Sequence, residues 1–356
     1  MDLSYHTFGM DPEALARSCS LLGGDVDLLD LSEEPNPNRR YGSVPYIMDW
    51  LDASLAADFL KSLAPEKPFY DSEFHVTRDD HPVTNAASAK AHLETALWLA
   101  HLHGMSANLA WYWSRNADGS VAGAEWFRGS LLQQPWTLQG SAQGTLSLSR
   151  FVREVQFFAQ EPRPVRLLYS EASAIQDVGY LDTLRDAYEA LNFLGVFIGI
   201  LTERQLGEHG VPAGTRLVIV PNARYAQDPT VAALKASRHC PRVAVVQTPG
   251  CQGLRASRLT PRRLTTSTLS TGLKKQVSTE KWSPSTPAEG QRGASRFGRR
   301  ARGGRRFAYA VNLLRQPVKV TLRWRANQAQ WCDCRSGATL PRQVTLSPRQ
   351  LLFGSY

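Results

Sequence analysis

Apolar and polar positions alternate with two different periods along the first 160 residues. Short apolar runs that end in polar side chains are typical of strands, and longer stretches with apolar residues every three to four positions are typical of helices. The pattern predicts strands over 3–8, 26–31, 68–75 and 105–113, and helices over 11–22, 48–63, 86–103 and 146–160. Strands that alternate with helices favour a parallel sheet, and four such units are half of an eight-stranded barrel. We therefore predict an α/β chain with an incomplete, TIM-like parallel β/α barrel over residues 1–162.

The apolar pattern changes after Glu161-Pro162. Runs of β-branched residues without alternation predict strands that are buried on both faces, at 165–169, 196–201, 216–221 and 242–246. Helices at 179–194 and 228–236 separate them, which predicts a small doubly wound, flavodoxin-like domain over 163–248. The loop after its first strand, Ser170 to Ser173, contains no glycine and is no dinucleotide fingerprint, so we expect no nucleotide cofactor.

The last third of the chain begins with a basic, low-complexity stretch. Residues 251–306 hold fourteen Lys and Arg against two Asp and Glu, a net charge of +12, so the other 300 residues carry −3 of the total of +9. A connector over 249–306 fits this distribution better than a basic binding face, although an arm that binds nucleic acid is an alternative. Residues 307–356 alternate again and predict a small, antiparallel, β-sandwich-like domain.

Several signals for targeting and for metal binding are missing from the sequence. No apolar run reaches the roughly 18 residues of a membrane span, and the first residues lack the basic and apolar regions of a secretory signal. Cys332 and Cys334 are one residue apart without a second pair, and His6, His75 and His81 lack the spacing of metal ligands. We therefore expect a cytoplasmic protein with free thiols, no membrane contact, no metal and no cofactor.

The chemistry is expected where the strand over 68–75 ends. In a parallel barrel the carboxyl ends of the strands carry the catalytic residues, and Glu73 lies at such an end. It is a candidate nucleophile for sugar chemistry, and the alternative is a glutamate that only pairs with a neighbouring arginine. The side chains expected around a bound sugar are aromatic or polar, namely Trp111, Tyr112, Trp113, His75, Asn108, Arg115 and Asp30.

The order of a β/α barrel, a flavodoxin-like domain and a small β domain resembles that of the family 42 β-galactosidases of the glycoside hydrolases. The sequence Phe-Tyr-Asp-Ser-Glu ending at Glu73 resembles the seventh barrel strand with that family's nucleophile, and Trp111 to Arg115 resembles the eighth, whose Trp forms a sugar platform. Residues 26–31 resemble the sixth strand and residues 5–8 the end of the fifth, so strands one to four would precede residue 1.

The family's acid/base has no counterpart in this sequence. It is an Asn-Glu pair at the end of the fourth strand, and the sequence contains no Asn-Glu dipeptide. Glu33 and Glu34, after the strand that precedes Glu73, are the best substitutes, because neighbouring strands are about 4.8 Å apart and retaining enzymes hold their carboxyl groups roughly 5 to 5.5 Å apart. A solvated acidic loop is the alternative for this pair, and Asp30 and Asp71 are weaker candidates.

The resemblance implies a retaining β-glycosidase that hydrolyses terminal β-galactosides or β-glucosides with Glu73 as nucleophile. The alternative is a catalytically impaired remnant that binds carbohydrate or has a structural role. A half-barrel has two open sheet edges, which favours a homo-oligomer.

Overall fold

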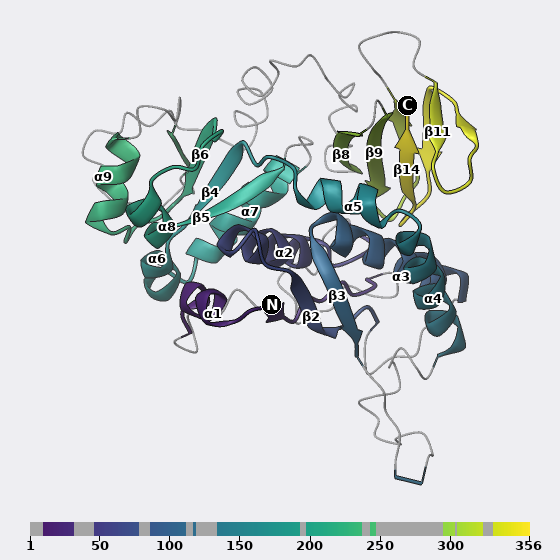
Figure 1. Cartoon of the computed structure of the whole chain (residues 1–356), viewed down its shortest axis with the longest axis horizontal. Helices are drawn as coiled ribbons and strands as arrows, with labels where there is room; N and C mark the ends of the chain where they lie inside the picture. The colour runs from purple at the N-terminus through teal and green to yellow at the C-terminus, as the bar shows by residue number, and fades with distance from the viewer. Residues whose placement is uncertain are drawn as a thin grey trace.

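A computed structural model of the chain describes residues 10–31, 46–77, 86–111, 117–118, 134–192, 197–236, 243–246, 295–302, 305–322 and 330–356. Over these ranges the protein is an α/β chain with two parallel sheets and an antiparallel sheet at the carboxyl-terminal end, as predicted. Figure 1 shows the three sheets, with helices α2 (Leu51–Leu63) and α7 (Tyr180–Asn192) lying between the two parallel ones. In the described ranges no helix is long and apolar enough to cross a membrane.

The first parallel sheet has three strands in the order β1-β2-β3. These strands are β1 (Leu22–Gly24), β2 (Phe69–Phe74) and β3 (Met105–Ala110). Helices α1 (Pro12–Ser18), α2 (Leu51–Leu63) and α3 (Ala86–Leu102) alternate with them along the chain. The predicted strand over 3–8 lies outside the described residues. The sheet is a parallel β/α unit, and the structure does not show a closed barrel.

The region around β1 corrects two predictions. The helix predicted over 11–22 begins as expected, because Asp11 accepts hydrogen bonds from the backbone of Glu13 and Ala14, but it ends at Ser18. Lys67 Nζ lies 2.5 Å from Ala16 O and 2.7 Å from Cys19 O, so these carbonyls at the helix end are satisfied from outside the helix. The buried Leu22 then opens a strand that lies upstream of the predicted 26–31, and residues 25–29 have no assigned secondary structure.

The carboxyl-terminal half of this unit contains two helices where the sequence predicted one over 146–160. Helix α4 (Pro135–Ser149) ends before Phe151, and α5 (Val152–Ala159) follows. Phe151 leaves the helical path because its ring packs 6.0 Å from that of Trp98 and 5.4 Å from that of Phe353.

The second parallel sheet has the order β5-β4-β6-β7, which is the second-first-third-fourth order of flavodoxin-like sheets. Its strands are β4 (Val165–Tyr169), β5 (Ile198–Thr202), β6 (Leu217–Pro221) and β7 (Val243–Val246). Its helices are α6 (Glu171–Gln176), α7 (Tyr180–Asn192), α8 (Glu203–His209) and α9 (Asp228–Ala236). Every residue of β5 and β6 is buried, as expected for strands covered on both faces.

The antiparallel sheet has the order β12-β11-β14-β9-β8, and a separate pair is formed by two further strands. The five strands are β8 (Ser295–Arg302), β9 (Arg305–Asn312), β11 (Trp331–Asp333), β12 (Thr339–Leu340) and β14 (Leu351–Ser355), and the pair is β10 (Val318–Thr321) with β13 (Gln343–Leu346). Strand β8 lies inside the range 249–306 that the sequence predicts as a connector. The Arg- and Gly-rich sequence of β8 does not indicate a strand, and β8 forms because it pairs with β9.

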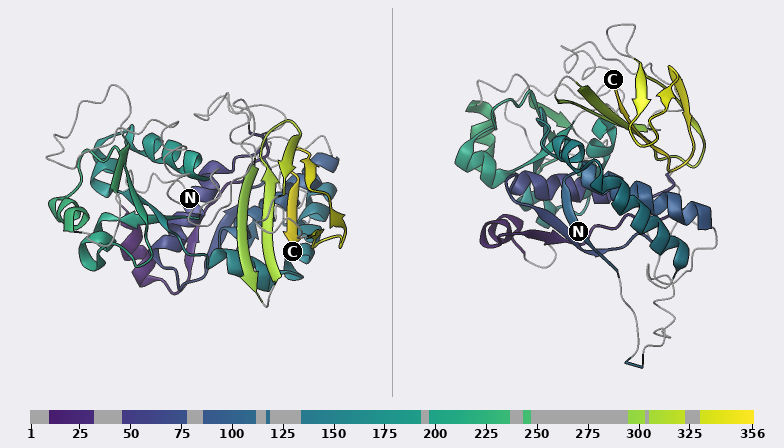
Figure 2. Two further views of the ribbon diagram at one scale, coloured as in Figure 1. Left: turned by 90° about the horizontal axis from the view of Figure 1, so that it is seen from above. Right: turned by 45° about the vertical axis from the view of Figure 1, so that its right-hand side comes forward.

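The three sheets share one hydrophobic core. Trp98 on α3 and Phe158 on α5 are completely buried, and both pack against Phe353 on β14, with ring centroids 5.0 Å and 6.1 Å away. Phe158 also contacts Tyr309 on β9 at 5.3 Å. The antiparallel sheet therefore lies directly on the helices of the first unit, as Figure 2 shows from two further directions.

Candidate functional site

The candidate site lies at the carboxyl ends of β2 and β3. Glu73, the predicted nucleophile, has a side chain that is 41% exposed, and its Oε2 lies 3.5 Å from His75 Nε2. The sheet register shifts between Asp71 and Phe74, and this irregularity coincides with the position of Glu73. An accessible carboxylate at the carboxyl end of a parallel strand is placed to meet a substrate.

An aromatic side chain flanks the carboxylate. The rings of His75 and Trp111 are 5.2 Å apart and inclined by 30°. The backbone N–H of Trp111 donates to Phe74 O at 3.3 Å, which holds the residue after β3 beside the end of β2. Glu73, His75 and Trp111 therefore lie side by side at this end of the sheet.

Asp71 lies two residues before Glu73 and is completely buried. Its Oδ1 accepts a hydrogen bond from the backbone N–H of Glu73 at 3.1 Å, and its Oδ2 has no partner. Burial raises the pKa of the Asp71 carboxyl to about 7, even though its hydrogen bonds from the backbone of Glu73 and Val26 act in the opposite direction. Asn108, a predicted sugar contact, is half-buried on β3 and opposite Asp71 in the sheet register.

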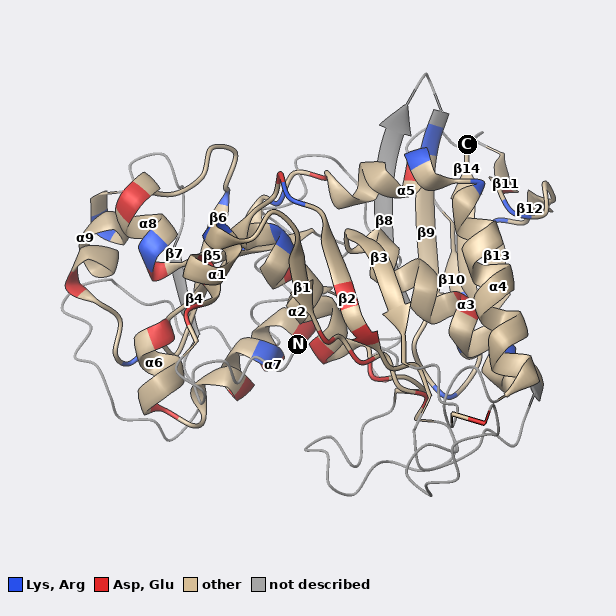
Figure 3. Ribbon diagram, turned by 60° about the horizontal axis from the view of Figure 1, so that its bottom comes forward, with Lys and Arg blue, Asp and Glu red and all other residues tan. Residues whose placement is uncertain are grey.

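More acidic side chains surround this end of the sheet. Ser72 Oγ donates to Asp25 Oδ1 at 2.5 Å, which joins β2 to the residue after β1. Figure 3 shows acidic segments gathered around the ends of β1 and β2. The Ser72–Asp25 contact was not predicted, because it joins residues 47 positions apart and no motif marks it.

Asp30, another predicted site residue, forms an ion pair with an arginine of the carboxyl-terminal region. Arg349 Nη2 lies 2.6 Å from Asp30 Oδ1, and both side chains are at most 10% exposed. The segment before Asp30 remains beside β2, because Leu28 N donates to His75 O at 2.9 Å and Asp30 N to Val76 O at 3.3 Å. Asp30 thus connects the first sheet to the carboxyl-terminal region.

The other predicted site residues lie outside the described residues, namely Glu33, Glu34, Tyr112, Trp113 and Arg115. Within the described ranges, no group of three or more His, Cys, Asp or Glu side chains could hold a metal ion. What the described residues provide is one accessible carboxylate, an imidazole, an indole ring and a buried acid beneath them. These groups suit nucleophilic attack on, or recognition of, a polar ligand with an apolar face.

Comparisons with known proteins define the class of fold first. No protein-family model and no curated protein matches the sequence. Solved structures do match: the chain has the fold of the glycoside hydrolases of family 42, at low sequence identity.

Three structures illustrate this similarity. An apo exo-carrageenase of family 42 from Bacteroides ovatus has a TM-score of 0.82 at 21% identity, over 98% of this chain and 49% of that chain. A catalytic mutant of the family 42 β-galactosidase Gan42B from G. stearothermophilus has a TM-score of 0.69 at 12% identity, over 97% and 60%. The β-galactosidase from Rahnella sp. R3 has a TM-score of 0.65 at 12% identity, over 97% and 61%. This chain therefore spans about half to three fifths of their lengths.

Proposed function

We propose that this chain is a retaining β-glycosidase that hydrolyses terminal β-galactosides or β-glucosides, with Glu73 as the nucleophile. The observation that carries the proposal is the accessible Glu73 beside the His75–Trp111 pair, at the carboxyl ends of parallel strands. The fold supports the class of reaction, since the similar structures include an exo-carrageenase and β-galactosidases.

The proposed reaction uses two carboxyl groups. A carboxylate oxygen of Glu73 forms a bond to the anomeric carbon while the bond from that carbon to the leaving oxygen breaks, and a second carboxyl group gives its proton to that oxygen. The second carboxylate then takes a proton from water, the water oxygen attacks the anomeric carbon, and Glu73 is released. We assign the second role to Glu33 or Glu34. Trp111 offers an apolar face to the sugar, while His75 and Asn108 bond its hydroxyl groups.

The three-stranded sheet corresponds in this proposal to part of an incomplete β/α barrel. Five of the six residues of β3 are at least partly exposed, and Leu109 is 57% exposed. An uncovered strand surface of this kind favours association with another chain, and we propose a homo-oligomer. A monodisperse monomer in light scattering would contradict this part of the proposal.

A substrate with a very good leaving group tests Glu73 without requiring the acid. With 2,4-dinitrophenyl β-galactoside, the leaving phenolate needs no proton, so a chain that lacks the acid still forms the glycosyl-enzyme. We expect release of dinitrophenolate by the wild-type chain and a loss of at least about 10³-fold in Glu73→Gln, because nucleophilic attack is abolished.

Two comparisons make this test specific. Glu66→Gln is the matched control, because Glu66 is an exposed glutamate just before β2, at the opposite end of that strand. For Glu73→Gly, added azide should restore turnover and yield the α-glycosyl azide, since azide attacks from the face that the nucleophile occupied. Turnover of Glu73→Gln equal to that of the wild type would overturn the assignment.

Carbohydrate binding without turnover is the second candidate function. It is favoured by the engagement of Asp30 with Arg349 and by the lack of an Asn-Glu dipeptide, because both leave fewer groups for the acid role. In that case calorimetry would detect galactose binding that weakens in Trp111→Ala, while no dinitrophenolate is released. Release of one or more equivalents would exclude this candidate.

A further inference from the structure

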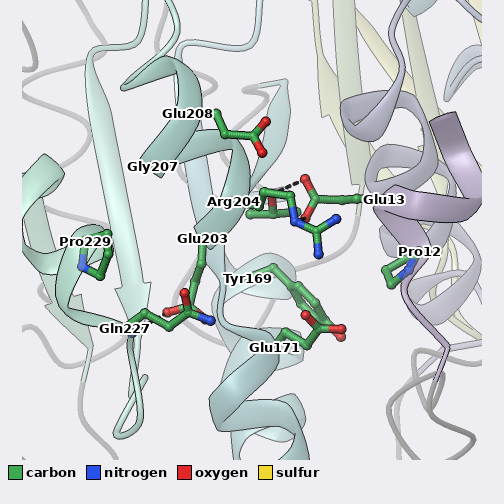
Figure 4. A pocket seen from close by; sticks show the side chains of 11 residues that line it. Pro12, Glu13, Tyr169, Glu171, Glu203, Arg204, Gly207, Glu208, Gln227 and Pro229 are labelled. Carbon is green, nitrogen blue, oxygen red and sulfur yellow. Dashed lines mark hydrogen bonds and ion pairs between the residues drawn. The ribbon is translucent and has the colours of Figure 1, made fainter.

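A cavity lies at the carboxyl edge of the flavodoxin-like sheet, in a different sheet from Glu73. Its volume is about 280 Å³, close to the lower end of the range for small-ligand pockets. Its walls come from the residues that follow β4, β5 and β6 and from helix α1, which closes one side (Figure 4). The crevice beside the point where strand order reverses, here between β4 and β6, is where sheets of this type bind ligands.

The walls of this cavity are acidic. Among the described residues that line it are Glu13, Glu171, Glu203 and Glu208, and one cation, Arg204. This arginine is already neutralised, because Arg204 Nη2 lies 2.6 Å from Asp11 Oδ2 and Arg204 Nε lies 3.8 Å from Glu13 Oε2. Glu13 also accepts a hydrogen bond from Thr202 Oγ1 at 2.8 Å. Arg204 is therefore paired mainly with Asp11 and Glu13, and it affects the pKa of Glu171 less than burial and the charge of Asp11 do. Glu208 lies 3.7 Å from His209, a pair that is ionic only when the histidine is protonated.

Glu203 is an unusual member of this set, because it is 6% exposed. Its Oε1 accepts a hydrogen bond from the backbone of Gln227 at 2.8 Å, whereas its Oε2 is buried without a hydrogen-bond partner. A buried carboxylate oxygen without a partner costs folding free energy, which a bound hydrogen-bond donor would recover. Burial, followed by the charge of Asp11, raises the pKa of the neighbouring Glu171 carboxyl. Both observations indicate a site that lacks a positive charge.

The spacing of the glutamate carboxylates around the cavity determines which kind of cation can bind there. In the described part of the chain no group of three acidic, histidine or cysteine side chains could hold one metal ion. Figure 4 shows Glu208, Glu171 and Glu203 at different sides of the cavity, where one compact ion would not reach all three. A flexible molecule with several separated ammonium groups would reach them. We propose that this cavity binds a linear organic polyamine, with its ammonium groups on Glu203, Glu171 and Glu208.

Calorimetry of the full chain with spermidine at low ionic strength tests the proposal. We expect one molecule bound per chain. We expect the affinity to fall at least tenfold in Glu171→Gln and in Glu203→Gln, since each removes one charge-assisted contact. Glu171 is only half-buried, so Glu171→Gln keeps the test valid should Glu203→Gln not fold. The control Glu66→Gln removes a glutamate outside the cavity, and its spermidine affinity should equal that of the wild type.

Two results would overturn the proposal. The first is the absence of spermidine binding, and the second is equal affinity in the wild type and both cavity variants, which would indicate general screening rather than a site. Because Glu73 lies in a different sheet, the glycosidase assay is unaffected by either outcome, and the two proposals fail independently.

Discussion

At the residue scale, Asp71 is the most informative side chain of the candidate site. The sequence indicated that Glu73 ends a strand, because an apolar run leads to it. It did not indicate that the carboxyl two positions earlier would be completely buried, with one oxygen on the backbone of Glu73 and the other without a partner. Asp71 therefore helps to hold the backbone of Glu73 in place through this hydrogen bond. Its burial raises the pKa of its own carboxyl group and so favours the protonated form.

The pKa of Asp71 makes the stability of the protein depend on pH. Burial raises this pKa from 3.8 to about 7, so between those values the folded state keeps a proton that the unfolded state has released. Stability should therefore fall as the pH rises from about 4 to 7, and Asp71→Asn should remove this contribution, on the order of 4 kcal/mol. Urea denaturation of both proteins across this range measures the difference, and parallel pH profiles would contradict the prediction.

At the scale of elements, helix α4 packs closely on α3 through two glycines. A methyl group added at Gly140 would lie 2.9 Å from the Cα of Lys90, and one added at Gly144 would lie 2.7 Å from a methyl carbon of Leu97. The sequence does not indicate a helix over residues 135–145, because the glycines there reduce helix propensity. Their role is visible only once the neighbouring helix is in place.

Alanine substitutions separate two effects of these glycines, namely the close packing on a neighbouring helix and the reduced helix propensity. Gly140→Ala should destabilise the protein by about 1–3 kcal/mol, because the backbone of α3 must move, even though alanine favours the helix. Gly207→Ala in α8 is the matched control: nothing lies within 4 Å of its added methyl group, so it should stabilise by about 0.5–1 kcal/mol. Thermal unfolding measures both, and a stabilising Gly140→Ala would contradict this account of the packing.

Strands β2 to β7 and helices α2, α3, α7 and α9 were predicted within a few residues, because their apolar periodicity is local. Helices α6 and α8 and strand β12 were not predicted. The elements β1 and β8 were missed or displaced for a different reason. Leu22–Gly24 and Ser295–Arg302 have no strand-like pattern and are ordered by pairing with β2 and β9. In the same way, the sequence indicated Glu73, His75 and Trp111 as candidates from their places at strand ends, whereas the pairing of Asp30 with Arg349, 319 positions away, depends on tertiary structure.

At the scale of the whole molecule, Asp58 on α2 connects the two parallel sheets. Its side chain is 3% exposed, and it lies 2.7 Å from Arg163 Nη1 and 3.3 Å from His103 Nδ1. Tyr188 on α7 donates to the same carboxylate at 2.6 Å. A buried carboxylate that holds groups from both sheet units fixes how these units pack together.

Removing this carboxylate should lower the free energy of unfolding much more than removing a partly exposed carboxylate on the same helix. Asp58→Ala should destabilise the chain by about 3–5 kcal/mol, because it leaves the cation of Arg163 buried without its partner. Asp52→Ala breaks an ion pair of 2.7 Å with Arg185, but Asp52 is 35% exposed, so the loss should be about 1 kcal/mol or less. Chemical denaturation of the two variants tests this, and similar losses would show that Asp58 is not the main connection.

The aromatic contacts of the shared core determine where the chain can be divided for expression. Trp98 and Phe158 belong to helices of the amino-terminal half, yet strands β9 and β14 provide the rings that cover them. A fragment that stops after β7 would keep both large side chains but lose the rings that bury them. It would therefore expose an apolar surface that favours aggregation. The carboxyl-terminal β domain thus shields these apolar side chains from water, and truncation experiments should retain it even when only the candidate site around Glu73 is of interest.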